Sequence, residues 1–208
     1  MNFVAKPSKT TRQLILGSTS RYRRELLERL GIPFQVAAPE VDETPLLQEA
    51  PRILAERLAL AKAKAVAAQF PQAVVIGSDQ VADLNGKSLG KPGTHDKAVA
   101  QLRLMRGQTV VFQTAVAVVC FENGFEQSSL AAVRVKFRDL TDDEIENYLQ
   151  LEKPYDCAGS AKSEGLGIAL LASIDSDDPT ALIGLPLIRT CQMLRAAGIE
   201  LLSNKAAS

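Results

Sequence analysis

Residues 73–81 (AVVIGSDQV) constrain the fold most, because a run of β-branched and small apolar side chains passes directly into polar ones. A continuous apolar run of this length predicts a strand that is buried on both faces of a sheet. A carboxylate is costly to bury unless it is paired, hydrogen-bonded or functional. Asp79 stands where this apolar run ends, so we predict that it is a functional group at a strand end.

Strand and helix patterns alternate along the rest of the chain. Residues 13–17 predict a buried strand that ends in a tight turn, and the region 51–70, rich in Ala, Leu, Lys and Arg, predicts the longest helix. The other predicted elements are a hairpin turn at Asn85-Gly86, helices over 22–30, 94–105, 141–149 and 185–197, and strands over 34–38, 110–121, 130–137 and 168–171. Together they predict a mixed α/β fold: a bent sheet with flanking helices and two lobes around a central cleft.

The chain of 208 residues is long enough to bury one sizeable core. We predict a flexible tail over residues 1–12 and a single domain over 13–208, with a second lobe at roughly 90–140.

Charge, cysteine content and the length of the apolar runs argue against a nucleic-acid-binding, disulfide-rich, membrane-spanning or secreted protein. The 24 basic and 24 acidic side chains cancel, which argues against general affinity for nucleic acid. Three widely spaced cysteines indicate reduced thiols and a cytoplasmic protein. No apolar stretch is long enough to span a membrane, and residues 1–12 lack the apolar run of a secretory signal.

Missing motifs narrow the chemistry further. His95 is the single histidine, so a Ser-His-Asp triad or a His-rich zinc site has little to draw on. Residues 86–91 have three residues between the glycines where a P-loop has four, and Pro92 replaces the magnesium-binding hydroxyl. Any general base is therefore expected to be a carboxylate.

Residues 18–24 (STSRYRR) place hydroxyl and guanidinium groups where a strand leads into a helix. Backbone N–H groups at a helix N-terminus and bidentate arginines are suited to a polyphosphate. A capped helix with a solvated basic edge fits the spacing equally well.

Acidic and basic side chains elsewhere offer further candidates. Glu40, Asp42 and Glu43 share one loop, and with Asp79 they could hold Mg²⁺ or Mn²⁺, although a solvated acidic turn is the alternative. Lys62 and Lys91 could each reach a phosphate or simply lie on the surface. The small-residue loop 157–165 suits close approach of a ligand or a plain turn, and the acidic run 175–178 is predicted to be solvated.

Taken in order, these stretches resemble the Maf family of nucleotide pyrophosphatases. The matching motifs are Leu-Ile-Leu-Gly-Ser18-Thr-Ser20 with Arg23-Arg24, Pro39-Glu40-Val-Asp42-Glu43, Lys62-Ala, Ile-Gly-Ser-Asp79-Gln80, Gly90-Lys91-Pro92, and Ala158-Gly-Ser160 with Lys162-Ser-Glu164-Gly. The resemblance implies a fold like that of inosine triphosphate pyrophosphatases and hydrolysis of a nucleoside triphosphate to a monophosphate and pyrophosphate. Ser-Asp-Gln resembles the subfamily that acts on 7-methyl-GTP, whereas the subfamily acting on dTTP and UTP has Ala-Asp-Thr.

The resemblance also implies a role for each matching residue. Asp79 becomes the proton acceptor, and it would hold a divalent cation (Mg²⁺, Mn²⁺ or Co²⁺) together with Glu40. Phosphate binding falls to Ser18, Arg23, Lys62 and Lys91, and selection of the base falls to Tyr22, Gln80 and Glu164. The alternatives are the same reaction on dTTP, UTP or another modified nucleotide, or a non-catalytic nucleotide-sensing regulator of cell division. A homodimer is the general expectation for a soluble protein.

Overall fold

The structure, a computed structural model, describes residues 12–202 and confirms the mixed α/β fold. Apart from Arg12, the predicted tail lies outside the described residues. The elements are β1 (Leu14–Gly17), α1 (Arg21–Glu28), β2 (Gln35–Ala37), α2 (Pro51–Gln69), β3 (Val74–Leu84), β4 (Lys87–Leu89), α3 (His95–Met105), β5 (Thr109–Cys120), β6 (Phe125–Phe137), α4 (Asp142–Glu152), β7 (Leu171–Asp175) and α5 (Leu187–Ala196), with short 3₁₀ turns η1 (Ala158–Ser160), η2 (Leu166–Leu170) and η3 (Ala181–Ile183).

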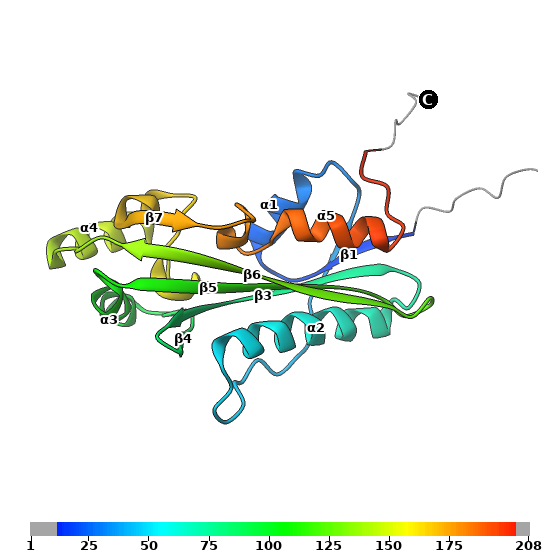
Figure 1. Cartoon of the computed structure of the whole chain (residues 1–208), viewed down its shortest axis with the longest axis horizontal. Coiled ribbons are helices and arrows are strands. Elements are labelled where there is room, and N and C mark those ends of the chain that lie inside the picture. Colours follow the sequence, from blue (N-terminus) through cyan, green and yellow to red (C-terminus); the bar gives the residue numbers. More distant parts are fainter. Residues whose placement is uncertain (1–11, 203–208) are drawn as a thin grey trace, which may run out of the picture.

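All seven strands belong to one open, mixed sheet. Its order is β2-β1-β3-β5-β6-β7, and β4 pairs with the end of β3. Strands β2, β1 and β3 are parallel, whereas every other pairing is antiparallel. Helix α2 covers one face of the sheet and α1 and α5 cover the other, while α3 and α4 lie together at the far end (Figure 1).

One edge of β3 is interrupted. The pairing of β3 with β1 stops at Gly77, opposite Gly17, and the pairing with β4 starts only at Ala82, opposite Leu89. On its other side β3 pairs with β5 continuously from residue 75 to residue 83. Residues 78–81 are therefore unpaired on one side. The prediction that Asp79 stands at a strand end is wrong, because the parallel neighbour ends there while β3 itself continues.

Helix α2 lies directly against the backbone of β3 at Gly77. A Cβ atom at this position would lie 2.3 Å from the Ala59 carbonyl oxygen and 2.5 Å from the Ala63 nitrogen. Only a residue without a side chain fits so close a contact. The contact fixes the distance between β3 and the turn of α2 that carries Lys62.

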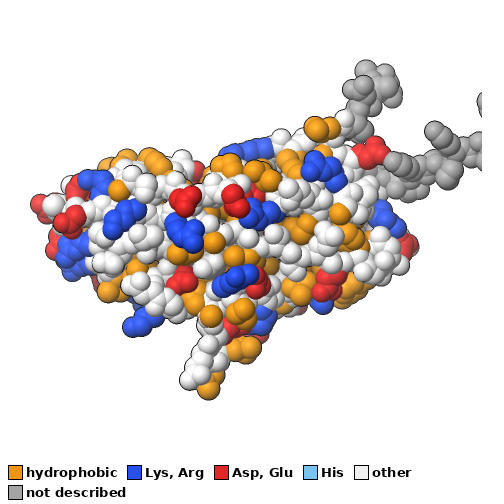
Figure 2. Space-filling model, in the orientation of Figure 1, with side chains coloured by type: hydrophobic (Ala, Val, Ile, Leu, Met, Phe, Trp, Pro, Cys, Tyr) orange, Lys and Arg blue, Asp and Glu red, His pale blue; other side chains and the backbone are white. Residues whose placement is uncertain are grey.

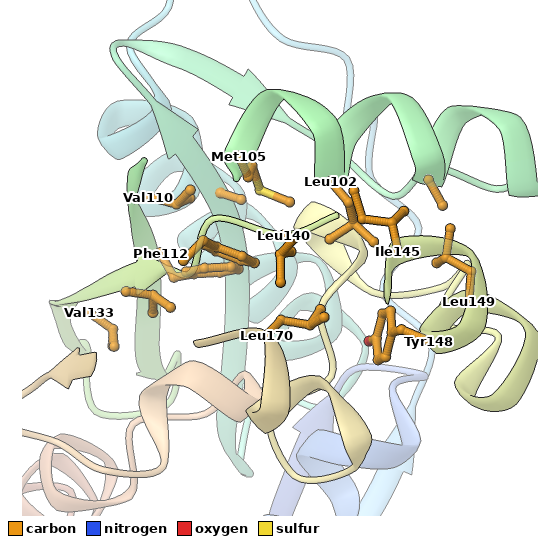
Figure 3. Packing of buried hydrophobic residues seen from close by; sticks show 14 of the residues in the cluster. Leu102, Met105, Val110, Phe112, Val133, Leu140, Ile145, Tyr148, Leu149 and Leu170 are labelled. Atoms are coloured by element: carbon orange, nitrogen blue, oxygen red, sulfur yellow. The ribbon is translucent and has the colours of Figure 1, made fainter. Parts of the chain in front are cut away.

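A second part of the core joins α3 and α4 to the sheet end. Leu102 and Met105 of α3, Ile145 and Leu149 of α4 and Phe112 of β5 belong to one buried cluster (Figure 3). The division into lobes, with one at roughly 90–140, stays a prediction. Within the described residues, no helix is long and apolar enough to cross a membrane.

Local hydrogen bonds explain where α4 begins, and the turn predicted at Asn85-Gly86 is confirmed. The Thr141 side chain accepts a hydrogen bond from the Glu144 nitrogen, and the Glu144 side chain accepts one from the Thr141 nitrogen. This reciprocal pair is a capping box, and it begins α4. Asn85 and Gly86 have positive φ angles of 54° and 83° in the turn between β3 and β4.

The strand predicted at 168–171 is wrong, because residues 166–170 form the turn η2 and the strand β7 begins at Leu171. A Cβ at Gly167 would lie 2.5 Å from the Lys162 carbonyl oxygen, and the Leu166 nitrogen donates to Glu152 at 2.7 Å. The close approach of Gly167 to Lys162 and the hydrogen bond from Leu166 to Glu152 hold the apolar segment in a turn.

We expect Gly77→Ala to destabilise the protein by about 1–3 kcal/mol, because the added methyl group overlaps the backbone of α2. Urea unfolding of the variant and the wild type measures this. Gly90→Ala is the matched control, since a Cβ there meets nothing within 4 Å and φ is not positive. Equal midpoints for Gly77→Ala and the wild type would show that α2 can move away without cost.

Candidate active site

A cleft of about 830 Å³ lies at the unpaired edge of β3, a size suited to a nucleotide. The turn after β1 and the start of α1 form one wall, and the turn after β4 forms another. Eight of the predicted site residues line it: Ser18, Tyr22, Arg23, Lys62, Asp79, Gln80, Lys91 and Glu164. The ninth, Glu40, is exposed and is not among the lining residues.

Asp79 and Lys62 form a buried ion pair at the floor of the cleft. The Lys62 ammonium lies 2.7 Å from Asp79 Oδ1 and 2.8 Å from Glu43 Oε1. Lys62 is only 5% exposed and Asp79 only 7%, whereas the Glu43 side chain is 60% exposed. Two carboxylates thus converge on one ammonium group, and the alternative that Lys62 is a surface lysine is wrong.

The loop that carries Glu43 is fixed to α2 by an arginine. Arg57 binds both carboxylate oxygens of Glu49, at 2.6 and 2.8 Å, and its guanidinium also donates to the Thr44 carbonyl at 3.1 Å. The bond from Arg57 lowers the pKa of Glu49 to about 2. Leu46 and Leu47 of this loop are exposed. The loop projects below the body of the molecule in Figure 1, and Figure 2 shows apolar side chains at the tip of this projection.

The N-terminus of α1 forms the wall next to Asp79. Ser20 caps the helix by accepting from the Arg23 nitrogen, and the Ser20 nitrogen donates to Ser18 Oγ at 3.2 Å. Arg23 Nε donates to the Gly184 carbonyl oxygen at 2.8 Å. Burial lowers the pKa of Arg23, and the negative charges of Asp79 and Glu43 oppose that shift. A fixed cation next to helix N–H groups is suited to binding phosphate.

Tyr22 also lines the cleft, and its aromatic side chain is only partly buried. The Arg21 guanidinium lies 4.7 Å from its ring centroid and donates to its hydroxyl at 2.7 Å. Burial raises the pKa of Tyr22 to about 12 and that of Cys157, which contacts the Tyr22 hydroxyl, to about 11. Cys157 is a protonated thiol at neutral pH, which argues against its use as a nucleophile.

Gln80 and Glu164 present polar groups that suit recognition of a base. The Gln80 amide nitrogen lies 2.9 Å from Thr114 Oγ1, the Ala181 carbonyl and the Leu182 carbonyl, which leaves the Gln80 carbonyl oxygen without a partner among the described residues. Burial raises the pKa of Glu164. Both side chains line the cleft and can accept hydrogen bonds from a ligand.

Several lining residues were not predicted. They include Asp156, which lies beside Tyr22, and the turn Leu182, Ile183 and Gly184, whereas Arg21 and Cys157 belong to the segments 18–24 and 157–165 that the sequence offered as ligand-binding candidates. Gly184, with φ of 128°, was the available sequence signal for a special turn. The prediction that residues 175–178 are solvated is wrong for Asp178, which is fully buried. His95 lies outside the cleft and contacts Glu146 and Tyr155.

Comparison with known proteins shows which family the chain matches. The profile of the family described as "Maf-like protein" matches residues 13–197. A protein named 7-methyl-GTP pyrophosphatase from Polaromonas sp. strain JS666 is 78% identical over 196 residues, which cover 94% of this chain and 90% of the relative. Proteins with the same name from Albidiferax ferrireducens and Cupriavidus pinatubonensis are 71% identical over 191 residues (92% of this chain, 96% of the relative) and 59% identical over 186 residues (89% and 94%).

We expect Lys62→Met to lower the free energy of unfolding by about 1–3 kcal/mol, because the variant leaves the buried Asp79 carboxylate without its partner. Glu43→Gln is the control: it removes an exposed partner of the same lysine and should change stability by less than about 0.5 kcal/mol. Chemical denaturation of the two variants distinguishes these outcomes. If both were as stable as the wild type, the buried pair would contribute nothing to the fold.

Proposed function

The chain belongs to the family of Maf-like proteins, and on that premise we propose that it hydrolyses 7-methyl-GTP to 7-methyl-GMP and pyrophosphate. Water attacks the α-phosphorus, the bond to the bridging oxygen of the β-phosphate breaks, and pyrophosphate leaves. The observation that carries the proposal is the Asp79–Lys62 pair, which lies at the open edge of β3 in a cleft of nucleotide size. The names of the relatives support the choice of nucleotide.

Asp79 is the proposed proton acceptor. Its Oδ1 atom lies 2.7 Å from the Lys62 ammonium, and an aspartate carboxylate can accept a hydrogen bond or a proton from water. Lys62 and Arg23 supply positive charge beside it, and Ser18 and Lys91 extend the polar lining. Fixed cations of this kind stabilise the negative charge that develops on the phosphates during the reaction.

A divalent cation such as Mg²⁺, Mn²⁺ or Co²⁺ fits the donor set of the cleft. Among the described residues no group of three or more His, Cys, Asp and Glu side chains could hold a metal ion, but Mg²⁺ is commonly held by one or two carboxylates together with substrate phosphates. Bound there, the ion would neutralise phosphate charge. We assign its protein ligands to Asp79 and Glu43 rather than Glu40, because Glu43 and Asp79 converge on Lys62 whereas Glu40 lies outside the cleft lining.

We assign recognition of the base to Tyr22, Gln80 and Glu164, which all line the cleft. A methylated guanine ring carries positive charge, which favours an aromatic face. Guanine also presents N–H donors on N1 and on its 2-amino group, and the carboxylate of Glu164 and the free carbonyl oxygen of Gln80 are the matching acceptors in the cleft.

The cellular setting is part of the same proposal. Cys120, Cys157 and Cys191 are free thiols, which supports a reducing cytoplasm. A homodimer stays the general expectation for such a protein.

We expect the purified protein to release pyrophosphate from 7-methyl-GTP with a kcat/KM about tenfold or more above that for GTP, since a desolvated cation–π contact contributes on the order of 2 kcal/mol. The assay compares 7-methyl-GTP, GTP, dTTP and UTP with Mg²⁺ or Mn²⁺, and a sample with excess chelator should be inactive. A preference for dTTP would overturn the choice of substrate. Tight nucleotide binding without pyrophosphate release under any condition would indicate a nucleotide sensor.

We expect Asp79→Asn to lower kcat by at least about 100-fold, because the amide cannot take a proton from water. The variant keeps the size of the side chain, and circular dichroism verifies that it is folded. Asp83→Asn, on the same strand but not among the residues that line the cleft, is the control and should retain wild-type turnover. Near-normal turnover by folded Asp79→Asn would remove Asp79 from the mechanism.

A further inference from the structure

The turn at residues 181–184 holds Gln80, one of the proposed base-selecting residues. The carbonyl oxygens of Ala181 and Leu182 each accept from the Gln80 amide nitrogen at 2.9 Å. Ala181 O also accepts from Thr114 Oγ1 at 2.9 Å, so β3, β5 and this turn meet at one carbonyl group. These bonds orient the Gln80 amide, because they occupy its nitrogen, while its oxygen has no partner in the part of the chain that the structure describes.

The same turn also holds Arg23, one of the proposed phosphate-binding residues. The Gly184 carbonyl oxygen accepts from Arg23 Nε at 2.8 Å, and it shares the Ser78 hydroxyl proton, at 3.0 Å, with the Ala115 carbonyl oxygen at 2.8 Å. Ser78 and Gln80 are the two neighbours of Asp79 on β3, so the turn binds the strand on both sides of the proposed proton acceptor. A shift of this turn would therefore move the base-selecting and phosphate-binding groups together.

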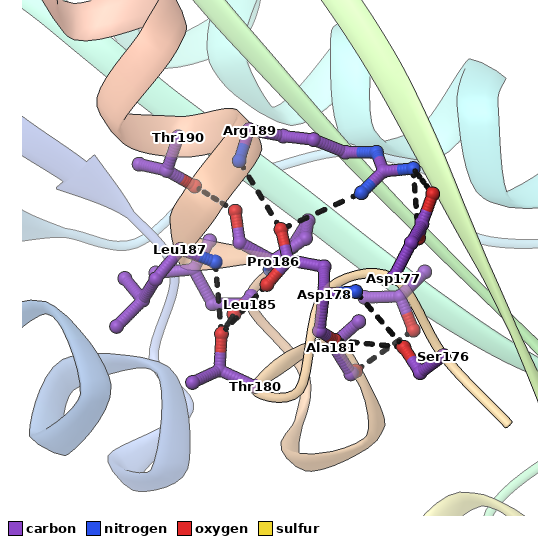
Figure 4. Close-up of polar contacts among 11 residues, drawn as sticks. Ser176, Asp177, Asp178, Thr180, Ala181, Leu185, Pro186, Leu187, Arg189 and Thr190 are labelled. Carbon is purple, nitrogen blue, oxygen red and sulfur yellow. Dashed lines mark hydrogen bonds and ion pairs between the residues drawn. The ribbon is translucent and has the colours of Figure 1, made fainter. Parts of the chain in front are cut away.

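A buried carboxylate outside the cleft anchors the turn. Asp178 is fully buried and is not among the residues that line the cleft. Its Oδ2 atom accepts from the backbone nitrogen of Arg189 at 3.1 Å and lies 3.6 Å from the Arg189 guanidinium (Figure 4). Its main chain takes part as well, since the Asp178 carbonyl accepts from the Ala181 nitrogen at 3.0 Å.

Thr180 extends this anchor to the start of α5. Its Oγ1 accepts from the Leu187 nitrogen at 2.8 Å, and its hydroxyl proton is shared between the Leu185 carbonyl at 2.8 Å and Asp178 Oδ1 at 3.2 Å (Figure 4). Helix α5 has no side-chain cap from Pro186, the residue at its N-cap position. Asp178 and Thr180 instead satisfy N–H groups of its first turn. The loop is thus joined to a helix that packs into the core.

We propose that Asp178, with Thr180, is a positioning residue of the active site: it fixes the 181–184 turn on the N-terminus of α5 and thereby aligns Gln80 and Arg23. Asp178 touches neither substrate nor metal in this role. The inference rests on the proposed pyrophosphatase function for its kinetic readout, but its geometric content does not depend on that function.

The test compares Asp178→Asn, Thr180→Val and Thr180→Ser, assayed well below the Tm of each variant. Asp178→Asn keeps the shape of the side chain but removes its charge and one of its acceptors. We expect it to lower kcat/KM for 7-methyl-GTP by about 10- to 100-fold, the size of effect that a displacement of about 1 Å produces, and to reduce the preference for 7-methyl-GTP over GTP. Thr180→Val should act in the same direction, and Thr180→Ser, which keeps the hydroxyl, should retain activity and selectivity.

Asp177→Asn is the matched control. Asp177 binds the same arginine, at 3.0 and 3.1 Å, but its side chain is 73% exposed and makes no hydrogen bond to the turn among the described residues. Its loss should leave kcat/KM and the substrate preference unchanged. A difference between Asp177→Asn and Asp178→Asn separates the anchoring of the turn from a general effect of Arg189.

The outcomes are distinct. Folded Asp178→Asn and Thr180→Val with wild-type kcat/KM and selectivity would overturn the positioning role, even if their Tm were lower. An inactive wild type would overturn the proposed function instead. In that case a crystal structure of Asp178→Asn decides: displaced Gln80 and Arg23 side chains support the positioning role, and unchanged positions overturn it.

Discussion

Strand β3 is paired with β5 along nearly its whole length, but on its other side it loses β1 after Gly77 and gains β4 only at Ala82. Four residues between these points have an open edge, and the candidate site is built around them. The sheet thus provides rigidity from one side and access from the other. The turns after β1 and β4 carry the phosphate-binding candidates to the same gap, because both strands stop at it.

Side chains along β3 alternate between the two faces of the sheet, so neighbouring residues of the site contact different layers of the fold. Asp79 points towards α2 and binds Lys62, whereas Ser78 and Gln80 point the other way and bind the 181–184 turn. In the proposed mechanism the proton acceptor therefore depends on packing of α2, and the alignment of Gln80 and Arg23 depends on the 181–184 turn and its anchor at α5. One strand couples them, since its three consecutive residues contact both layers.

Features that depend on near neighbours in sequence could be predicted, and features that depend on distant contacts could not. The capping box at Thr141 and the turn at Asn85-Gly86 follow from local hydrogen bonds and backbone angles. Eight of the lining residues were predicted, and the resemblance to a known family resolved the alternatives that their local pattern left open. The burial of Asp178 and the convergence of Glu43 on Lys62 depend instead on partners that spacing does not reveal. The same holds for residues 166–170, where contacts with Glu152 and Lys162 override an apolar pattern.

Gly77 carries no functional group, yet the backbone of α2 rests on it on either side of Lys62. The reach of the lysine ammonium to Asp79 is consequently set by the absence of one methyl group on the neighbouring strand. A survey of single substitutions scored by turnover would place this glycine among the functional residues, beside the carboxylate and the ammonium whose separation it determines. Functional importance and chemical participation are therefore different properties at this site, and they diverge at the close contact between Gly77 and α2.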